Sequence, residues 1–227
     1  MNSAKIIAIT QPIIRSQTSK ENYSTLTVEE FVAYVARVSN PSNQNNTLTA
    51  SKLLNYLIKN NHWSPFEMVN IVMEIETTRD IGRQILRHRS FSFQEFSQRY
   101  ADPTKDLGFT MRDARLQDLK NRQNSIETED ERLINLWGEV QNNAKNHAIN
   151  AYNWAINNGI AKEQARAVLP EGLTVSRMYM NGSLRSWIHY CLLRSSNGTQ
   201  KEHQDIAKCC WENILTYFPH LKNIELQ

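Results

Sequence analysis

Glycine and cysteine are scarce in this sequence of 227 residues, which contains seven glycines and three cysteines. No two glycines are separated by a single residue, so the G-x-G-x-x-G turn that binds dinucleotides is absent. The G-x-x-x-x-G-K-[ST] phosphate loop is absent as well. If the protein binds nucleotides, side chains must therefore hold the phosphates in place of backbone N–H groups.

The three cysteines are Cys191, Cys209 and Cys210. Adjacent cysteines rarely bridge each other, and no pair has the spacing of metal ligands. The pattern predicts a protein of the reducing cytoplasm with no metal site, in which each cysteine is a small core residue rather than a nucleophile.

Long hydrophobic runs are missing too. The longest, such as Ile6–Ile9, fall far short of the ~20 residues of a membrane span. Thr10, Gln11 and Pro12 interrupt this run before it could serve as a secretory signal. The net charge of +3 is too weak to favour nucleic acid as a partner. We expect one globular domain over residues 1–227, without a membrane span.

Hydrophobic periodicity predicts alternating strands and helices. Val69, Ile71, Met73 and Ile75 recur every second residue, as in a half-buried strand. Thr27 is a candidate N-cap, and Asn157-Asn158-Gly159 is a candidate helix stop. We expect a strand or a strand and turn at 5–14, strands at 69–76 and 173–180, and helices at 28–38, 48–58, 78–89, 129–157, 161–169, 184–193 and 200–217. We expect residues 90–100 to be extended or irregular, and residues 102–126 to form a polar, turn-rich segment on the surface.

The most unusual segment is 84–99, QILRHRSFSFQEFSQR. On a helix, Gln84, Arg87 and His88 would share one face. In an extended chain, Glu95, Ser97 and Arg99 would share one side. Guanidinium groups bind phosphate through paired hydrogen bonds, so the segment indicates an anion-binding site.

Other interpretations of this segment remain open. Charge-rich helix ends are common on solvated surfaces, although the interleaved Phe91, Phe93 and Phe96 favour partial burial. A nucleic-acid-binding module would place the arginines of 87–99 on phosphates and stack bases on the phenylalanines. An oligomerisation domain would use the arginines in ion pairs across an interface.

Arg87-His88-Arg89, followed by seven residues and Ser97, resembles the R-H-R-x7-S signature of the flavin-dependent thymidylate synthases. Three further segments resemble elements of this family in the same order. They are His62–Glu67 (H-x-[ST]-P-F-E), Gln164–Pro170 (A-R-x-x-L-P), and Ser183–Arg194 with Gln200–Glu202 beyond it, which is similar to the family's last helix pair. The resemblance covers about residues 30–217.

This resemblance implies an α+β fold with a mixed or antiparallel sheet flanked by helices and a portion rich in long helix. It implies a homotetramer with active sites shared between subunits. The implied reaction is the reductive methylation of dUMP to dTMP without a cysteine nucleophile. Methylenetetrahydrofolate supplies the carbon, reduced FAD the hydride, and NADPH reduces the flavin. The implied partners are these small molecules and not nucleic acid.

The same resemblance assigns site residues. Those assigned to dUMP are Gln84, Arg87, Glu95, Ser97, Arg99, Arg166 and Arg194, with Arg166 coming from a neighbouring subunit. Those assigned to FAD are Ser39, Ser64, Arg87, His88, Arg89, Gln94, Glu95, Arg185 and His189. His62 would lie near the flavin and the folate. The catalytic residues would be Arg194, whose charge stabilises the pyrimidine oxygens, and Ser97, whose hydroxyl donates a hydrogen bond.

Three positions depart from the family pattern. Gln94 and His189 stand where asparagine is frequent. Asn197-Gly198-Thr199 stands where a histidine often contacts the adenine end of FAD. The sequence leaves open how that end is held, whether NADPH or NADH is preferred, and the order of methylene and hydride transfer.

Overall fold

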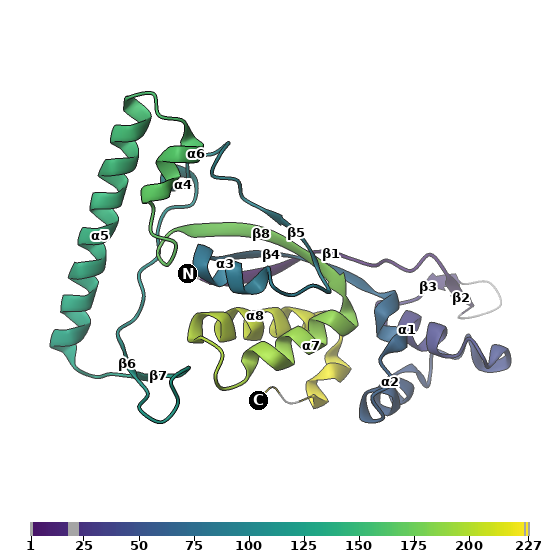
Figure 1. Ribbon diagram of the computed structural model, residues 1–227. Helices are drawn as coiled ribbons and strands as arrows, with labels where there is room; N and C mark the ends of the chain where they lie inside the picture. The colour runs from purple at the N-terminus through teal and green to yellow at the C-terminus, as the bar shows by residue number, and fades with distance from the viewer. Residues whose placement is uncertain (1, 18–22, 225, 227) are drawn as a thin grey trace.

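A four-stranded antiparallel sheet forms the centre of the computed structural model, which describes residues 2–17, 23–224 and 226. The strand order is β1 (Ser3–Ile9), β4 (Asn70–Thr78), β8 (Val175–Ser183) and β5 (Ser92–Glu95). Two short hairpins stand apart from the sheet, β2 (Arg15–Gln17) with β3 (Tyr23–Thr25) and β6 (Arg115–Gln117) with β7 (Ser125–Glu127). The α+β class with an antiparallel sheet flanked by helices is thus confirmed (Figure 1).

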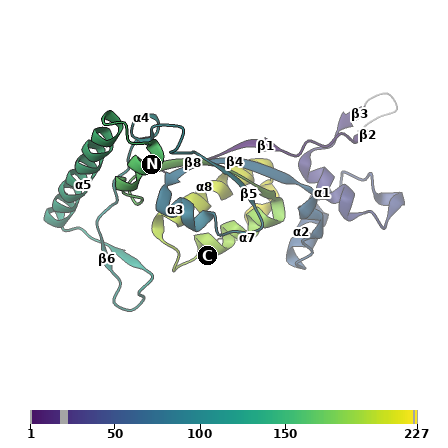
Figure 2. The same cartoon turned by 45° about the horizontal axis from the view of Figure 1, so that its top comes forward.

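The helices lie in three places around this sheet. In Figure 1, α7 and α8 run beneath the sheet, α1 and α2 lie at one end, and α5 stands at the other end beside α6. Figure 2 shows the same arrangement from a second direction. The helix bounds are α1 (Val28–Ala36), α2 (Ala50–Lys59), α3 (Arg79–Ile85), α4 (Pro103–Asp106), α5 (Glu131–Asn157), α6 (Lys162–Ala165), α7 (Leu184–Ser195) and α8 (Lys201–Tyr217), with 3₁₀ segments at Pro41–Asn43, Ser64–Met68, Arg166–Val168 and Pro219–Asn223. No helix in the described ranges is long and apolar enough to cross a membrane.

The core lies between the sheet and the helices below it. The alternation expected in β4 is confirmed, because Ile71, Met73 and Ile75 are fully buried. Trp187 of α7 is fully buried as well, and its Nε1 donates to the carbonyl oxygen of Ile71 at 3.0 Å. This bond joins α7 to the central strand and fixes the distance between the helix and the sheet.

Gly182 lets the segment after α3 approach β8 closely. A Cβ atom at Gly182 would lie 2.4 Å from Cδ1 of Phe91, well inside contact distance. The Phe91 ring fills this space and packs edge-on against Trp187, with ring centroids 4.9 Å apart. The arginine-rich segment is therefore anchored in the core by its first phenylalanine.

One predicted element end agrees with its alternative and one is wrong. In the segment 5–14 the strand ends at Ile9, because Thr10 turns to exchange hydrogen bonds with the backbone of Asn70, and Pro12 has no N–H to donate. The helix expected at 78–89 ends at Ile85. By contrast, the Thr27 cap is confirmed, since its side chain accepts from the backbone N–H of Glu30 in a reciprocal capping box.

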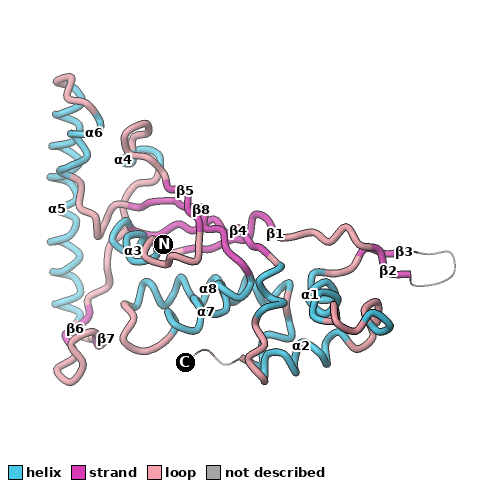
Figure 3. Tube along the Cα trace, turned by 45° about the vertical axis from the view of Figure 1, so that its right-hand side comes forward, coloured by secondary structure: helices cyan, strands magenta, loops and turns pink. Residues whose placement is uncertain are grey.

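Helix α5 extends away from the rest of the chain along much of its length (Figure 3). Its expected stop is confirmed, because the helix ends at Asn157 and Gly159 has a φ of 78°. The buried residues of this helix are Gln141, Ala148, Tyr152 and Ala155. Trp137, Val140 and Ala144 line a cavity of ≈ 400 Å³ together with Gln141.

Candidate active site

Gln84, Arg87 and His88 do not share a helical face, contrary to the expectation from spacing. Gln84 lies in the last turn of α3, whereas Arg87 and His88 follow the helix in a turn. His88 points inward and Arg87 is exposed. The chain leaves the helix here because Phe91, three residues after His88, must reach its place against Gly182.

His88 holds Arg194, which lies in the last turn of α7. Nε of Arg194 donates to Nε2 of His88 at 2.9 Å. Burial and the nearby charges of Arg194 and Arg87 lower the pKa of His88 to about 4, so the imidazole is neutral. Since Nε2 accepts, the single proton of His88 lies on Nδ1. The two terminal nitrogens of Arg194 have no partner among the described residues and are free to meet an oxygen of a ligand.

Glu95 is engaged within the chain. Its Oε1 accepts from Ser176 Oγ at 2.9 Å and lies 3.5 Å from Nη1 of Arg79, while its Oε2 lies 3.7 Å from Nη1 of Arg83. Both arginines also pair with Glu171. The sequence did not lead us to expect Arg79 or Arg83 here. These two arginines pair with the carboxylate of Glu95, whereas the arginines of 87–99, which are closer to Glu95 in the sequence, do not.

Ser97 and Arg99 lie in a turn, not on one side of an extended segment as expected. Strand β5 ends at Glu95, and the N–H groups of Tyr100 and Ala101 bond back to the carbonyl oxygen of Ser97. Ser97 Oγ accepts from the backbone N–H of Arg99 at 3.4 Å. The guanidinium of Arg99 is exposed and lies over the ring of Tyr100, 5.8 Å from its centroid.

Arg166 lies on the other side of this turn. It begins the 3₁₀ segment after α6, and its Nε donates to the carbonyl oxygen of Glu163. Lys162 of α6 donates to the carbonyl oxygen of Tyr100 at 2.9 Å, which joins α6 to the turn that carries Arg99. The terminal nitrogens of Arg166 meet no partner among the described residues.

Arg185 and His189 lie on the outer part of α7, near the 3₁₀ segment Ser64–Met68. Nη1 of Arg185 donates to Oε1 of Glu67 at 2.7 Å, and Ser183 donates to Oε2. The Ser183 hydroxyl, assisted by Arg185, outweighs the effect of burial and lowers the pKa of Glu67. His189 packs edge-on against Trp63, and its pKa is lowered by burial and by Arg185.

Ser39, Ser64 and His62 lie at this same end of the molecule. Ser64 is exposed at the start of its 3₁₀ segment. The ring of His62 is exposed and meets that of Tyr56 in α2 at 5.9 Å. Ser39 follows α1 and borders a cavity of ≈ 470 Å³.

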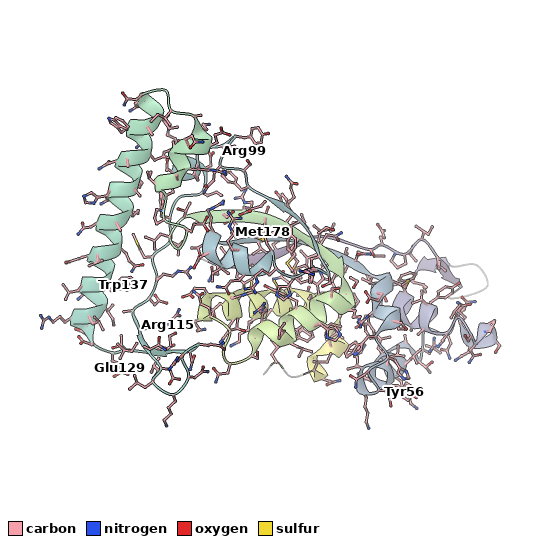
Figure 4. All side chains as sticks on the ribbon, viewed as in Figure 1. Tyr56, Arg99, Arg115, Glu129, Trp137 and Met178 are labelled. Carbon is pink, nitrogen blue, oxygen red and sulfur yellow. The ribbon has the colours of Figure 1, made fainter. Side chains whose placement is uncertain are left out.

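Some of the assigned residues are far apart within one chain, with Ser97 and Arg99 toward one end of the sheet and Ser64, Arg185 and His189 toward the other. Others lie together, because Arg87 and Glu95 carry both assignments and His88 accepts from Arg194. Phe96 bonds to Arg177 near the start of β8, and Ser183 ends this strand. Six residues of extended chain span ~20 Å, so Ser97 and Arg99 are far from Ser183 and Arg185. Figure 4 shows the same separation, with Arg99 beside α6 and Tyr56 at the opposite end on α2.

Arg87, Arg89 and Gln94 are exposed, and their side chains have no partner among the described residues. The two guanidinium groups are therefore ready to bind an anion, as the donor set of a phosphate site requires. Phe91 is buried and cannot stack on a base, so the nucleic-acid interpretation of this segment receives no support.

The sequence analysis missed a buried polar group next to Gln84. His203 and Tyr190 have exposed fractions of 0% and 1%, and Nδ1 of His203 lies 3.2 Å from Oε1 of Gln84. A signal for it exists in the sequence, because His203 lies on the apolar stripe of α8 with Ile206, Cys210 and Ile214.

These features describe an α+β protein whose arginine-rich surface is suited to anionic ligands. A family model described as thymidylate synthase complementing protein matches residues 23–220. A probable flavin-dependent thymidylate synthase of Paramecium bursaria Chlorella virus 1 is 47% identical over 219 residues, which cover 96% of each chain. The flavin-dependent thymidylate synthase of Synechocystis sp. is 47% identical over 194 residues, 86% of this chain and 87% of that one.

A solved structure has the same fold. The UMP/dUMP methylase PolB from Streptomyces cacaoi, bound with 5-Br dUMP, superposes with a TM-score of 0.78 at 22% identity, covering 98% of this chain and 95% of that chain. From the family match and the 47% identities, the chain belongs to the flavin-dependent thymidylate synthase family. The resemblance found in the sequence is thereby confirmed.

Proposed function

We propose that this protein converts dUMP to dTMP, with methylenetetrahydrofolate as the carbon donor, reduced FAD as the hydride donor and NADPH as the reductant of the flavin. The observation that carries the proposal is the intact R-H-R-x7-S signature in a chain of this family, with the guanidinium groups of Arg87 and Arg89 unpaired among the described residues. FAD, when bound and reduced, supplies the hydride.

The residues assigned to dUMP bind and orient it. Arg99 and Arg166 donate to the phosphate, and Ser97 adds a hydroxyl. Arg87, Gln84 and Glu95 complete the contacts. Arg194, held by neutral His88, directs its free nitrogens to the pyrimidine and stabilises the negative charge that develops on the ring oxygens.

Two of the chain's three cysteines do not fit a nucleophilic role. Cys191 and Cys210 are fully buried, and burial raises the pKa of both thiols far above the ordinary value, so neither forms a thiolate at neutral pH. Charge stabilisation by Arg194 therefore takes the place of covalent activation in this proposal. The three thiols are free, which suits the cytoplasmic location that we also propose.

The donor set fits FAD. Arg87, Arg89 and Arg185 offer guanidinium groups for its two phosphates, and the hydroxyls of Ser39 and Ser64 add donors. His88, Gln94, Glu95 and His189 would complete the contacts, with His62 near the flavin and the folate.

We further propose a homotetramer of single-domain subunits, each spanning residues 1–227, with shared active sites. Two observations support this. Ser97 and Arg99 are separated within one chain from Arg185 by most of the length of β8. Helix α5 exposes large apolar side chains that a second subunit would cover: Leu133, Ile134, Leu136, Trp137, Val140 and Trp154.

The test is product formation by the purified protein. We expect a yellow protein with a flavin absorption band that makes dTMP from dUMP only when the folate, FAD and NADPH are all present. A protein that stays colourless after soaking in FAD, or that binds oligonucleotides but not dUMP, would contradict the proposal.

A further inference from the structure

Gln84 lies in the middle of a chain of side-chain hydrogen bonds that begins at a buried tyrosine and ends at a buried carboxylate. Tyr190 Oη lies 3.1 Å from His203 Nε2, and His203 Nδ1 lies 3.2 Å from Gln84 Oε1. Gln84 Nε2 donates to Gln200 Oε1 at 2.8 Å, and Gln200 Nε2 donates to Glu202 Oε2 at 2.9 Å. We call these five residues the Gln84 network. Only Gln84 among them is assigned to a ligand.

The carboxylate end fixes the direction of the bonds. Nη1 of Arg112 lies 3.2 Å from Oε2 of Glu202, and Arg115 donates to Oε1. Burial raises the pKa of Glu202, but the hydrogen bonds to its carboxylate and the two guanidinium groups outweigh it and lower the pKa below its ordinary value. An ionised carboxylate only accepts hydrogen bonds, so Gln200 must turn its amide nitrogen toward Glu202 and its oxygen toward Gln84.

The remaining bonds follow from this one. Since Gln200 presents an oxygen, Gln84 must turn its nitrogen toward Gln200 and its oxygen toward His203. His203 must then carry its proton on Nδ1, and its Nε2 accepts from the hydroxyl of Tyr190. Burial lowers the pKa of His203 to about 3, with further lowering by Arg194 and His88, which agrees with a neutral ring carrying one proton.

One amide hydrogen of Gln84 remains. Of its two N–H groups, one donates to Gln200, and the other has no partner among the described residues. Gln84 as a whole is partly exposed to solvent. If the amide were free to rotate, it could present either a donor or an acceptor to that ligand.

We propose that Gln200 and Glu202 are positioning residues that hold the amide of Gln84 so that its second N–H is left to donate to the substrate. Gln84 then contacts an oxygen acceptor of dUMP, a phosphate or carbonyl oxygen, and not a ring N–H. This inference rests on the proposed function in one respect, namely that the ligand of Gln84 is dUMP.

The substitution Gln200→Ala tests the inference. It removes the oxygen that accepts from Gln84 Nε2, and with it the link through which Glu202 fixes the direction of the Gln84 amide. We expect the KM for dUMP to rise about three- to tenfold, which corresponds to the loss of one hydrogen bond, with little change in kcat. The matched control is Gln204→Ala, because Gln204 lies four residues further along the chain and its amide donates to the backbone of Thr199, outside the Gln84 network. This control should bind dUMP as the unsubstituted protein does.

The pair with Gln84→Ala separates a positioning role from a structural one. In the Gln84→Ala protein, which itself binds dUMP more weakly, adding Gln200→Ala should have no further effect on KM. An equal rise in both backgrounds, or no rise from Gln200→Ala in the unsubstituted protein, overturns the inference and leaves the proposed function standing. Unchanged dUMP binding in Gln84→Ala, or no dUMP binding by the unsubstituted protein, overturns the assignment of dUMP to this site and the inference with it.

Discussion

Gly182→Ala tests whether the arginine-rich segment is anchored through the contact of Phe91 with β8. The added Cβ would lie 2.4 Å and 2.5 Å from two ring carbons of Phe91, more than 1 Å inside the usual contact distance of about 3.5–4.0 Å. The ring cannot retreat easily, because Trp187 and Tyr190 lie behind it with ring centroids at 4.9 and 6.0 Å. Overpacking of this kind costs about 1–3 kcal/mol.

For a chain of this size, that cost corresponds to a fall in Tm of about 3–10 °C. Thermal unfolding followed by circular dichroism would measure it. Phe91→Leu removes the ring atoms that clash with the added Cβ. The fall in Tm of the double variant should therefore be smaller than the sum of the falls in the two single variants. A Tm for Gly182→Ala equal to or above that of the unsubstituted protein would refute the anchoring argument, as would strictly additive losses.

Three further predictions concern α7, the buried histidines and the substrate. Ser183→Ala removes the N-cap of α7 and a donor to Glu67, and should lower the free energy of unfolding in urea by about 1 kcal/mol, whereas Ser183→Thr should retain most of it. The pKa values of His88 and His203 in the folded protein are about 4 and 3, against an ordinary 6.5, so the unfolded chain binds more protons. The free energy of unfolding should therefore fall as the pH is lowered from about 6.5 to 4. A free energy of unfolding that does not change between pH 7 and 5 would count against the burial of these histidines as neutral rings. Arg99→Ala should weaken dUMP binding by about 1.5–3 kcal/mol in calorimetric titration, and Lys222→Ala, which removes an exposed cation near the C-terminal end, should not.

Local signals in the sequence were sufficient for much of the fold. The Thr27 cap, the alternation of β4 and the Asn157-Asn158-Gly159 stop each depend on neighbouring residues, and each is confirmed. The end of α3 was mistaken because it depends on Phe91 reaching Gly182, 91 positions away in the chain. Periodicity cannot detect a contact of that range.

The candidate site divides in the same way. The signature residues could be found from their spacing, but their partners could not. Glu95 pairs with Arg79 and Arg83, which the sequence places on a different element, and Gln84 meets His203 across 119 positions. These partners are determined by the packing of α3 and α8 against the sheet. The sequence gives only an indirect indication of them, namely His203 on the apolar stripe of α8.

Subunit mixing tests most directly the claim that arginines of different subunits build one site. Arg99 and Arg185 lie far apart within one chain, and Arg99→Ala and Arg185→Ala should each have little activity alone when dUMP and FAD are supplied at concentrations that only half-saturate the unsubstituted protein. If the site is shared, tetramers assembled from both variants contain some sites with both arginines intact, and dTMP formation should return.

The matched control mixes Arg99→Ala with Arg87→Ala, two changes in the same signature segment. If one subunit contributes the whole signature segment to each site, every site in this mixture carries one defect, and activity should stay lost. Recovery with Arg185→Ala but not with Arg87→Ala is the predicted result. A mixture of Arg99→Ala and Arg185→Ala no more active than either variant alone would contradict the account.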